Sequence, residues 1–288
     1  MDTRPGTDSG MNIVITGSTR GIGLGLAEEF LKRAHNVVIS SRRAEDVEAT
    51  VARLGQSFPD AEASGRACDV TDSDAVEQLW DHAVATFGQV DIWINNAGRN
   101  NAKQRIDMLP FDESRSTIAT NLLGTIYGSV TALRGMAAQG SGWIFNMEGF
   151  GSDGLINLEQ IPYGTSKYAV RYFTKGLVKT VKGSPVKVGF LSPGIVTTQM
   201  AVPPPDQRTA FHMRNKRLLN ILADHVETVT PWMVERILSA HKNGTAIRWL
   251  TTPVALGRFI LSPLVKRHPI DEAMARMDAA GESPRVQP

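Results

Sequence analysis

The sequence TGSTRGIG at residues 16–23 decides the fold that we expect for this chain of 288 residues. It follows an apolar run, residues 13–16, and begins a helical pattern that extends from Gly21 to Ala34. A glycine-rich turn between a strand and a helix lets backbone N–H groups approach a pyrophosphate, and the helix N-terminus adds partial positive charge there. The stretch predicts a dinucleotide site with contacts from Gly17, Ser18, Thr19, Arg20, Gly21, Ile22 and Gly23.

Downstream of this turn, short apolar runs alternate with longer helical patterns. The runs lie at residues 37–40, 66–70, 90–95, 143–146 and 186–191, and the helical patterns at 44–54, 73–87, near 114–138 and at 163–182. We expect Ser73 or Thr71 to cap the helix at 73–87. The alternation indicates βαβ units, and so an α/β fold: a doubly wound parallel sheet of the Rossmann type, in a single domain with a helical C-terminal cap.

The pattern changes after Pro193. A helix is expected at about 208–223, and a second one capped by Thr230, with Pro231 at its first position and its end near Gly244. A last strand follows at 247–250, and the tail carries a Met-bearing helix. These patterns predict a mobile leader at 1–10, a domain at 11–252 that includes a substrate cap at about 199–228, and a C-terminal extension at 253–288.

The composition is that of a globular protein. Hydrophobic residues make up 42% and charged residues 21%, and 31 Lys and Arg against 29 Asp and Glu give a net charge of +2, which disfavours disorder and nucleic-acid binding. The single cysteine, Cys68, excludes an internal disulfide, and the six histidines show no metal-ligand spacing, so no metal site is predicted. No secretion signal or membrane-spanning stretch is evident, which predicts a cytoplasmic location.

Tyr163 and Lys167 form a candidate catalytic pair. Positions i and i+4 share one face of a helix, so the ammonium is expected beside the phenol, where it favours the ionised form and brings the phenol pKa toward neutrality. The alternative is a core tyrosine beside a lysine that reaches solvent. The nucleotide turn upstream favours catalysis.

The end of the second strand indicates which cofactor is bound. It reads Ser40-Ser41-Arg42-Arg43 and contains no carboxylate that could accept from the ribose 2′-OH of NAD. Ser41 and Arg42, with Arg20 as a second cation, therefore predict NADP(H). Arg42 as a solvated residue at the start of the next helix is the alternative.

Five segments together resemble the short-chain dehydrogenase/reductase family over about residues 11–250. They are the turn at 16–23, Asn95-Asn96-Ala97-Gly98, Asn121, Tyr163-x3-Lys167, and Ser192-Pro193-Gly194 with Thr197. The resemblance implies that Tyr163 protonates the substrate oxygen, that Lys167 also holds the nicotinamide ribose, and that Asn121 supports a proton-relay water. It also implies cofactor contacts from Asp69, Val70, Asn96, Ala97, Gly98, Pro193, Gly194 and Thr197, and a homodimer or homotetramer.

One position departs from the family pattern. Family members carry a serine that hydrogen-bonds the substrate carbonyl about 13 residues before the tyrosine. Here that slot holds Gly149 when aligned from Asn146, or Phe150 when aligned from Tyr163. Ser152 is the nearby hydroxyl, and the glycines around it permit unusual backbone angles. Ser152 is therefore the candidate replacement.

The segment from Trp143 to Lys167 most resembles the chlorophyll b reductase branch of the family. The resemblance implies an NADPH-dependent reductase acting on the 7-formyl group of chlorophyll b or a similar bulky hydrophobic aldehyde. A sterol- or lipid-like ketone or alcohol is the alternative substrate, and a catalytically impaired NADP-binding sensor is the alternative function.

The tail carries an apolar stretch, residues 254–265, which contains Arg258 and is flanked by the basic residues Lys266 and Arg267. Such a stretch suits a membrane surface or a large hydrophobic ligand. Packing on the protein's own core or on a partner subunit is the favoured interpretation.

Overall fold

The computed structural model describes residues 10–202, 208 and 210–279. Of the predicted leader only Gly10 is among them, so its predicted mobility lies outside the described residues, as do residues 203–207 of the cap and the tail from 280.

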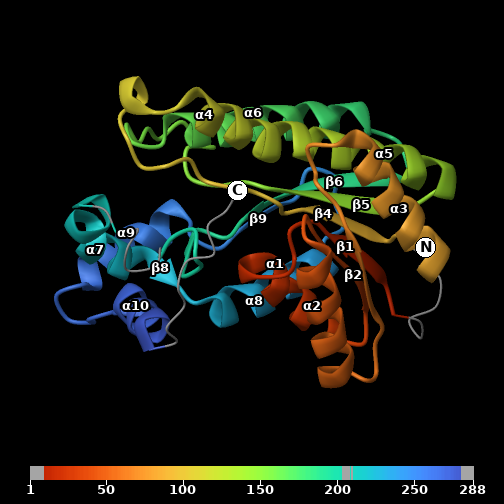
Figure 1. The fold of residues 1–288 in the computed structure, drawn as a ribbon, viewed down its shortest axis with the longest axis horizontal. Coiled ribbons are helices and arrows are strands. Elements are labelled where there is room, and N and C mark those ends of the chain that lie inside the picture. The colour runs from red at the N-terminus through yellow and green to blue at the C-terminus, as the bar shows by residue number, and fades with distance from the viewer. Residues whose placement is uncertain (1–9, 203–207, 209, 280–288) are drawn as a thin grey trace.

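Seven parallel strands form the central sheet of the described residues, in the order β3-β2-β1-β4-β5-β6-β9 (Figure 1). The predicted doubly wound parallel sheet is confirmed, with the order reversing between β1 and β4. The strands are β1 (Asn12–Ile15), β2 (Asn36–Ser41), β3 (Ala63–Ala67), β4 (Ile92–Asn95), β5 (Gly142–Met147), β6 (Val186–Ser192) and β9 (Ala246–Arg248).

Helices cover both faces of the sheet, each over its own hydrophobic core. One core holds Phe30 and Met233 and the other Trp93 and Met136, all of them fully buried. Figure 1 shows the first set of helices below the sheet and α4, α5 and α6 above it. The first set is α1 (Gly21–Leu31), α2 (Ala44–Ser57) and α8 (Val226–Leu238); the second is α3 (Ser73–Phe87), α4 (Phe111–Ile118), α5 (Gly124–Gln139) and α6 (Ile161–Thr180).

The helix predicted near 114–138 is interrupted by a π-helical turn. A short 3-10 helix (Ile106–Met108) and α4 precede this turn, which spans Ala119–Leu123 and leads directly into α5. Such turns recur at functional positions because the extra residue changes which side chains face inward. This one carries the fully buried Asn121.

Two predicted caps are wrong. Asp72 caps α3, because its carboxylate accepts from the backbone N–H groups of Asp74 and Ala75. α8 begins at Val226 rather than after Thr230, whose hydroxyl donates to the Val226 carbonyl at 2.9 Å, so Pro231 lies inside the helix. A Thr hydroxyl that bonds back to the preceding turn suits a helix interior, which makes it a poor boundary signal.

Three predicted boundaries also move. β3 ends at Ala67, because its register against β2 runs from Val37↔Ala63 to Ser41↔Ala67 and leaves Asp69 in a turn. β9 ends at Arg248, and α8 ends at Leu238, well before Gly244.

The cap has a small core of its own, to which the C-terminal extension contributes. The core includes Val202, Ala223 and Ile270, so the extension packs into the cap. The elements here are β7 (Ile195–Val196), α7 (Ala210–Leu222), β8 (Ala223–Asp224), α9 (Thr252–Leu261) and α10 (Pro269–Ala279). α7, α9 and α10 gather at one side of the molecule (Figure 1).

α9 buries none of its residues, so packing of this apolar stretch on the protein's own core is wrong. Leu256 is 59% exposed and Ile260 67% exposed. The helix is fixed from its other side, where Arg258 donates to the buried Asp224 at 2.8 Å. In the described part of the chain, no helix has the length and apolar character that crossing a bilayer requires.

Candidate active site

The glycine-rich turn closes tightly on the end of β4. Gly17 and Gly21 have φ of +64° and +58°, which favours glycine. A Cβ on Gly17 would lie 2.8 Å from the Ala97 Cα, and one on Gly23 would lie 2.4 Å from the Gly17 carbonyl oxygen. Backbone contact thus explains the glycines directly, and it leaves the turn free of side chains.

Hydrogen bonds join this turn to Asn96 and Ala97. The Asn96 amide donates to the carbonyls of Thr16 and Gly17, both at 2.9 Å. The Thr16 hydroxyl accepts from the backbone N–H groups of Asn96 and Ala97, both at 3.0 Å. Two segments that the sequence assigned separately to the cofactor therefore form one surface at the carboxyl ends of β1 and β4.

Ser18 is committed to the protein interior. Its hydroxyl donates to the Ile15 carbonyl at 2.7 Å and accepts from the Ser40 N–H at 3.0 Å, and its own N–H donates to the Ser40 carbonyl at 2.9 Å. Ser18 is fully buried. It fastens the turn to β2, so the predicted cofactor contact from its side chain would require breaking these bonds.

The predicted 2′-phosphate residues lie at the end of β2 and in the turn. Arg42 is exposed and forms no ion pair within the described ranges. The Arg43 Nε, in contrast, lies 3.6 Å from the Glu45 Oε2 and 3.6 Å from the Asp46 Oδ2. Arg20 is exposed and donates to the Gln199 side chain at 3.0 Å. These positions fit a phosphate on the adenosine ribose, because the cations are accessible.

Two further predicted adenine contacts, Asp69 and Val70, lie after β3. The Asp69 carboxylate accepts from the N–H and the hydroxyl of Thr71, at 2.9 and 2.8 Å. Val70 is buried against α5, since a Cβ on Gly124 would lie 2.6 Å from the Val70 Cγ2. The turn is thus held rigidly at this edge.

The segment after β6 brings Thr198 into contact with the glycine-rich turn, and the predicted cofactor residue Thr197 precedes it. Thr197 hydrogen-bonds through its hydroxyl with His225 Nδ1 at 3.0 Å and donates its N–H to the Asp224 carbonyl at 2.9 Å. A Cβ on Gly21 would lie 3.3 Å from the Thr198 Cγ2. Before it, Gly194 has φ +73° after Pro193, which makes the bend that returns the chain toward the turn.

Tyr163 and Lys167 are both buried and share one face of α6, as predicted. The Lys167 Nζ lies 5.9 Å from the centroid of the Tyr163 ring and donates to the Met147 carbonyl at 3.1 Å. A Cβ on Gly98 would lie 3.7 Å from this Nζ. The lysine therefore connects α6 to the ends of β4 and β5.

Burial dominates the titration of this pair. It raises the pKa of Tyr163 to about 12 and lowers the pKa of Lys167 to about 8, the latter against the opposing effect of the Glu148 carboxylate. The expectation that Lys167 brings the phenol pKa toward neutrality is thus wrong for this structure. Loss of hydration raises the phenol pKa by more than the Lys167 ammonium could lower it, because the ammonium lies over the ring and not at the hydroxyl.

Asn121 is held by three hydrogen bonds. Its Oδ1 accepts the Arg99 N–H at 2.8 Å, and its Nδ2 donates to the Arg99 carbonyl and to the Ser166 hydroxyl, both at 2.9 Å. Its Oδ1 would also lie 3.3 Å from a Cβ on Gly98. Asn121 and Lys167 therefore converge on Gly98.

The serine slot is filled by the phenol itself. A Cβ on Gly149 would lie 2.4 Å from the Tyr163 hydroxyl oxygen. Phe150 is 45% exposed. Ser152 is buried and donates its N–H to the Gly149 carbonyl at 3.1 Å, and among the described residues its hydroxyl makes no hydrogen bond with Tyr163.

Sequence reasoning missed several residues that support the site. The Asn101 side chain accepts the Tyr163 N–H at 3.2 Å and donates to the Glu159 carbonyl at 3.1 Å. Below the site, Asn95 donates to Asn146 at 2.8 Å in a buried polar network. The pairing of Asn95 with Asn146 follows from the β4–β5 register, which the sequence could have supplied.

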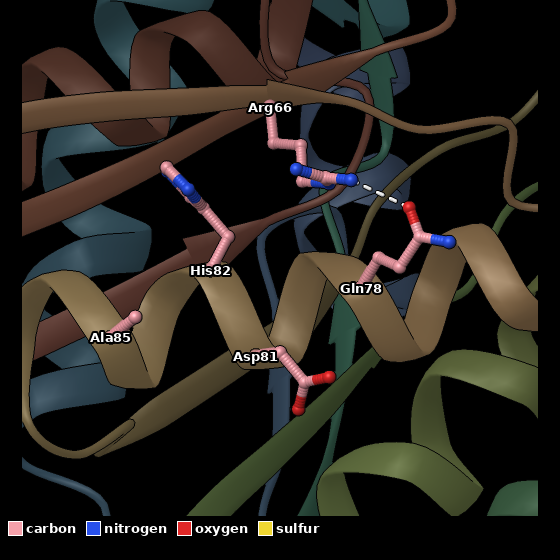
Figure 2. Close-up of a pocket in the computed structure, with 5 residues that line it drawn as sticks. All are labelled: Arg66, Gln78, Asp81, His82 and Ala85. Atoms are coloured by element: carbon pink, nitrogen blue, oxygen red, sulfur yellow. Dashed lines mark hydrogen bonds between the residues drawn. The ribbon is translucent and has the colours of Figure 1, made fainter.

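Of two hollows on the surface, one lies away from the predicted site residues and the other lies beside them. One of about 280 Å³ is lined by Arg66, Gln78, Asp81, His82 and Ala85, and Arg66 spans it to Gln78 (Figure 2); it includes no predicted site residue. Another, of about 570 Å³, lies beside the glycine-rich turn and is lined in part by Gly21, Thr197 and Thr198. Within the described chain no cluster of three or more His, Cys, Asp or Glu suits a metal ion.

Comparison with known proteins gives a consistent result. A family model described as short chain dehydrogenase matches residues 11–209. A probable chloroplastic chlorophyll(ide) b reductase of Arabidopsis thaliana is 34% identical over 292 residues, covering 96% of this chain and 58% of the relative. A chloroplastic chlorophyll(ide) b reductase of Oryza sativa subsp. japonica is 38% identical over 256 residues, covering 86% of this chain and 73% of the relative.

A solved structure of a ketoreductase has the same fold as this chain. An actinorhodin polyketide ketoreductase variant with NADPH superposes with a TM-score of 0.74 at 26% identity, covering 85% of this chain and 97% of that one. This chain spans less than two thirds of the length of the Arabidopsis relative, at 58%.

Proposed function

Because the chain belongs to the short-chain dehydrogenase/reductase family, in the branch of the chlorophyll(ide) b reductases, we propose that it reduces a carbonyl group with NADPH. One observation carries the proposal most directly. Lys167 and Asn121 converge at Gly98, Tyr163 lies beside Lys167 on α6, and Asn96 and Ala97, in the same segment as Gly98, are hydrogen-bonded to the glycine-rich turn. The proposed catalytic residues and the proposed nucleotide site thus lie at the same edge of the sheet.

The residues present fit a dinucleotide. The glycine-rich turn offers backbone without side chains, and Arg42 and Arg20 would meet a 2′-phosphate where no carboxylate repels it. Lys167 would hold the nicotinamide ribose. NADPH bound there would supply the hydride for the carbonyl carbon.

Tyr163 would donate the proton. With its pKa raised to about 12 by burial, the phenol is neutral at pH 7 and holds the proton that the substrate oxygen must receive. Protonated Lys167, one helical turn away, would stabilise the phenolate that remains. Asn121 fixes the backbone of Arg99 and so the floor of the site.

The oxygen also needs a second hydrogen-bond donor, because charge develops on it during hydride transfer. Gly149 has no side chain to donate. We assign this role to the Ser152 hydroxyl, which lies in the turn that Gly149 begins.

The preferred substrate is a bulky hydrophobic aldehyde, the 7-formyl group of chlorophyll b. Two observations support it: both plant relatives are chlorophyll(ide) b reductases, and the loop from β5 to α6 exposes Leu155, Ile156 and Leu158. A sterol- or lipid-like ketone would suit the same apolar loop.

The test is oxidation of NADPH by the purified protein with chlorophyll b, a panel of aldehydes and a panel of sterol-like ketones, beside Tyr163→Phe. Conversion of chlorophyll b that Tyr163→Phe abolishes supports the proposal. Preference for a ketone changes the substrate assignment. NADPH binding without oxidation of any compound refutes the reductase assignment and supports a sensor.

A further inference from the structure

The turn that carries Ser152 packs directly on α6. A Cβ on Gly151, which has φ +89°, would lie 2.7 Å from the Gly164 Cα, so the two backbones are in contact beside Tyr163. The Ser152 N–H donates to the Gly149 carbonyl at 3.1 Å and closes the turn. The position of this turn on α6 therefore determines where the Ser152 side chain lies relative to the Tyr163 phenol.

Arg171 holds this turn from the helix. It lies one turn after Lys167 on α6, and its guanidinium donates to the Ser152 carbonyl at 3.3 Å. Its Nε lies 3.5 Å from the Glu148 Oε1. The arginine thus bridges the end of β5 and the turn that follows it.

Glu148 is the unusual member of this arrangement. Its side chain is 1% exposed, and its Oε1 has no hydrogen-bond partner in the described part of the chain. Removing a carboxylate from water is unfavourable unless a charge partner is held in place. An energetically costly group directly beside the Met147 carbonyl that receives Lys167 suggests a function for it.

We propose that Glu148 and Arg171 are positioning residues that hold the Gly149–Ser152 turn against Tyr163, and so set the second donor on the substrate oxygen. This rests on the reductase function proposed above. Glu148 keeps the arginine extended along α6, and Arg171 fixes the Ser152 carbonyl. The pair thereby positions the Ser152 hydroxyl as the donor. This donor is needed because Gly149, which follows β5, has no side chain that could donate.

The charges around Glu148 are consistent with this role. Arg171 and Lys175 face it from α6, Arg248 lies 3.9 Å away on β9, and Asp153 adds a negative charge from the turn. Burial raises the pKa of Glu148, and the two arginines oppose that rise. A second consequence is that ionised Glu148 helps keep Lys167 protonated.

The experiment compares wild type with Arg171→Met, Arg171→Lys and the double variant Glu148→Gln/Arg171→Met, which leaves neither charge buried alone. Lys179→Met is the matched control, because Lys179 is exposed near the end of the same helix and is not among the charges that act on Glu148. Three quantities are measured: hydrogen exchange of the Ser152 and Gly154 amides, which donate to the Gly149 and Gly151 carbonyls, and kcat and KM for NADPH oxidation with the carbonyl substrate.

Arg171→Met and the double variant are expected to speed exchange of these two amides about tenfold and to lower kcat about tenfold, with the KM for NADPH changed less than twofold. Arg171→Lys should recover part of both losses. Lys179→Met should change neither.

Unchanged amide exchange in folded Arg171→Met overturns the proposal, whatever the activity. Faster exchange with unchanged kcat also overturns it, because the turn would then not act in the reaction. Faster exchange in a protein whose wild type reduces no carbonyl supports the hold on the turn and refutes the reductase function instead.

Discussion

The Tyr163 hydroxyl lies against the backbone of Gly149, so closely that a Cβ on Gly149 would be 2.4 Å from the hydroxyl oxygen. The residue in the usual serine slot is thus a glycine that the position of the phenol requires. The departure from the family pattern thus has a structural cause, the position of the phenol.

Gly149→Ala is expected to displace Tyr163 and to lower kcat about a hundredfold, since a misplacement of the reacting group by about 1 Å has an effect of that order. NADPH affinity should stay within twofold. Steady-state kinetics and a binding titration measure the two quantities.

Gly176→Ala is the control, because nothing lies within 4 Å of a Cβ at that position of α6. It should keep full activity and stabilise the helix by about 0.5–1 kcal/mol. Equal kcat in Gly149→Ala and wild type would contradict the account of the serine slot.

The reduction should lose rate as pH rises through about 8. Burial lowers the pKa of Lys167 to about 8, so the ammonium that stabilises the phenolate loses its proton there, whereas Tyr163, with its pKa raised to about 12, stays protonated. The pH profile of kcat/KM reports the free enzyme and should show one alkaline limb. A profile that is flat to pH 10 would refute this assignment.

Arg42→Ala should weaken NADPH binding about tenfold to a hundredfold while leaving NADH binding unchanged, because a charge-assisted hydrogen bond to phosphate contributes about 1.5–3 kcal/mol. Arg43→Ala is the matched control, since Arg43 already lies near Glu45 and Asp46. Fluorescence titration with both cofactors measures the effect. Equal losses in the two variants would remove Arg42 from the 2′-phosphate site.

Asn121→Ala should lower the free energy of unfolding by about 1–3 kcal/mol, because it leaves the buried backbone groups of Arg99 without partners. Asn121→Asp keeps an acceptor for the Arg99 N–H but loses the hydrogen bonds donated to the Arg99 carbonyl and the Ser166 hydroxyl. Its free energy of unfolding should therefore lie between those of wild type and Asn121→Ala. Urea denaturation measures this order. An unchanged urea midpoint in Asn121→Ala would show that Asn121 does not stabilise the Arg99 backbone beside the site.

The sequence predicts the sheet well for a physical reason. Strands such as β1 and β4 are buried on both faces, so their apolar runs stand out, and the glycines of the turn are demanded by backbone contact. The shared helix face of Tyr163 and Lys167 was also predictable, because it follows from their i, i+4 spacing.

Other features of the site are not encoded in the local sequence. His225 arrives from a distant segment to hydrogen-bond the Thr197 hydroxyl. The pKa of Tyr163, which the sequence predicted nearer neutrality, is raised by burial in the whole fold. The Ser40 N–H of β2 donates to the Ser18 hydroxyl, and the cofactor contact of Ser18 stays a prediction.

The apolar stretch at 254–265 illustrates the same limit. Its hydrophobicity predicted a buried segment, but Arg258 and Arg267 both bind the buried Asp224. These ion pairs orient α9, and its apolar side chains are left exposed.

The most direct test of the central claim is transfer of deuterium to chlorophyll b from NADPH that carries deuterium at both hydrogens of the nicotinamide C4, followed by mass spectrometry of the product. We predict a 7-hydroxymethyl product carrying one deuterium on the former formyl carbon, formed by wild type and not by Tyr163→Phe. Recovery of unlabelled product, or equal labelling by Tyr163→Phe, would contradict the account.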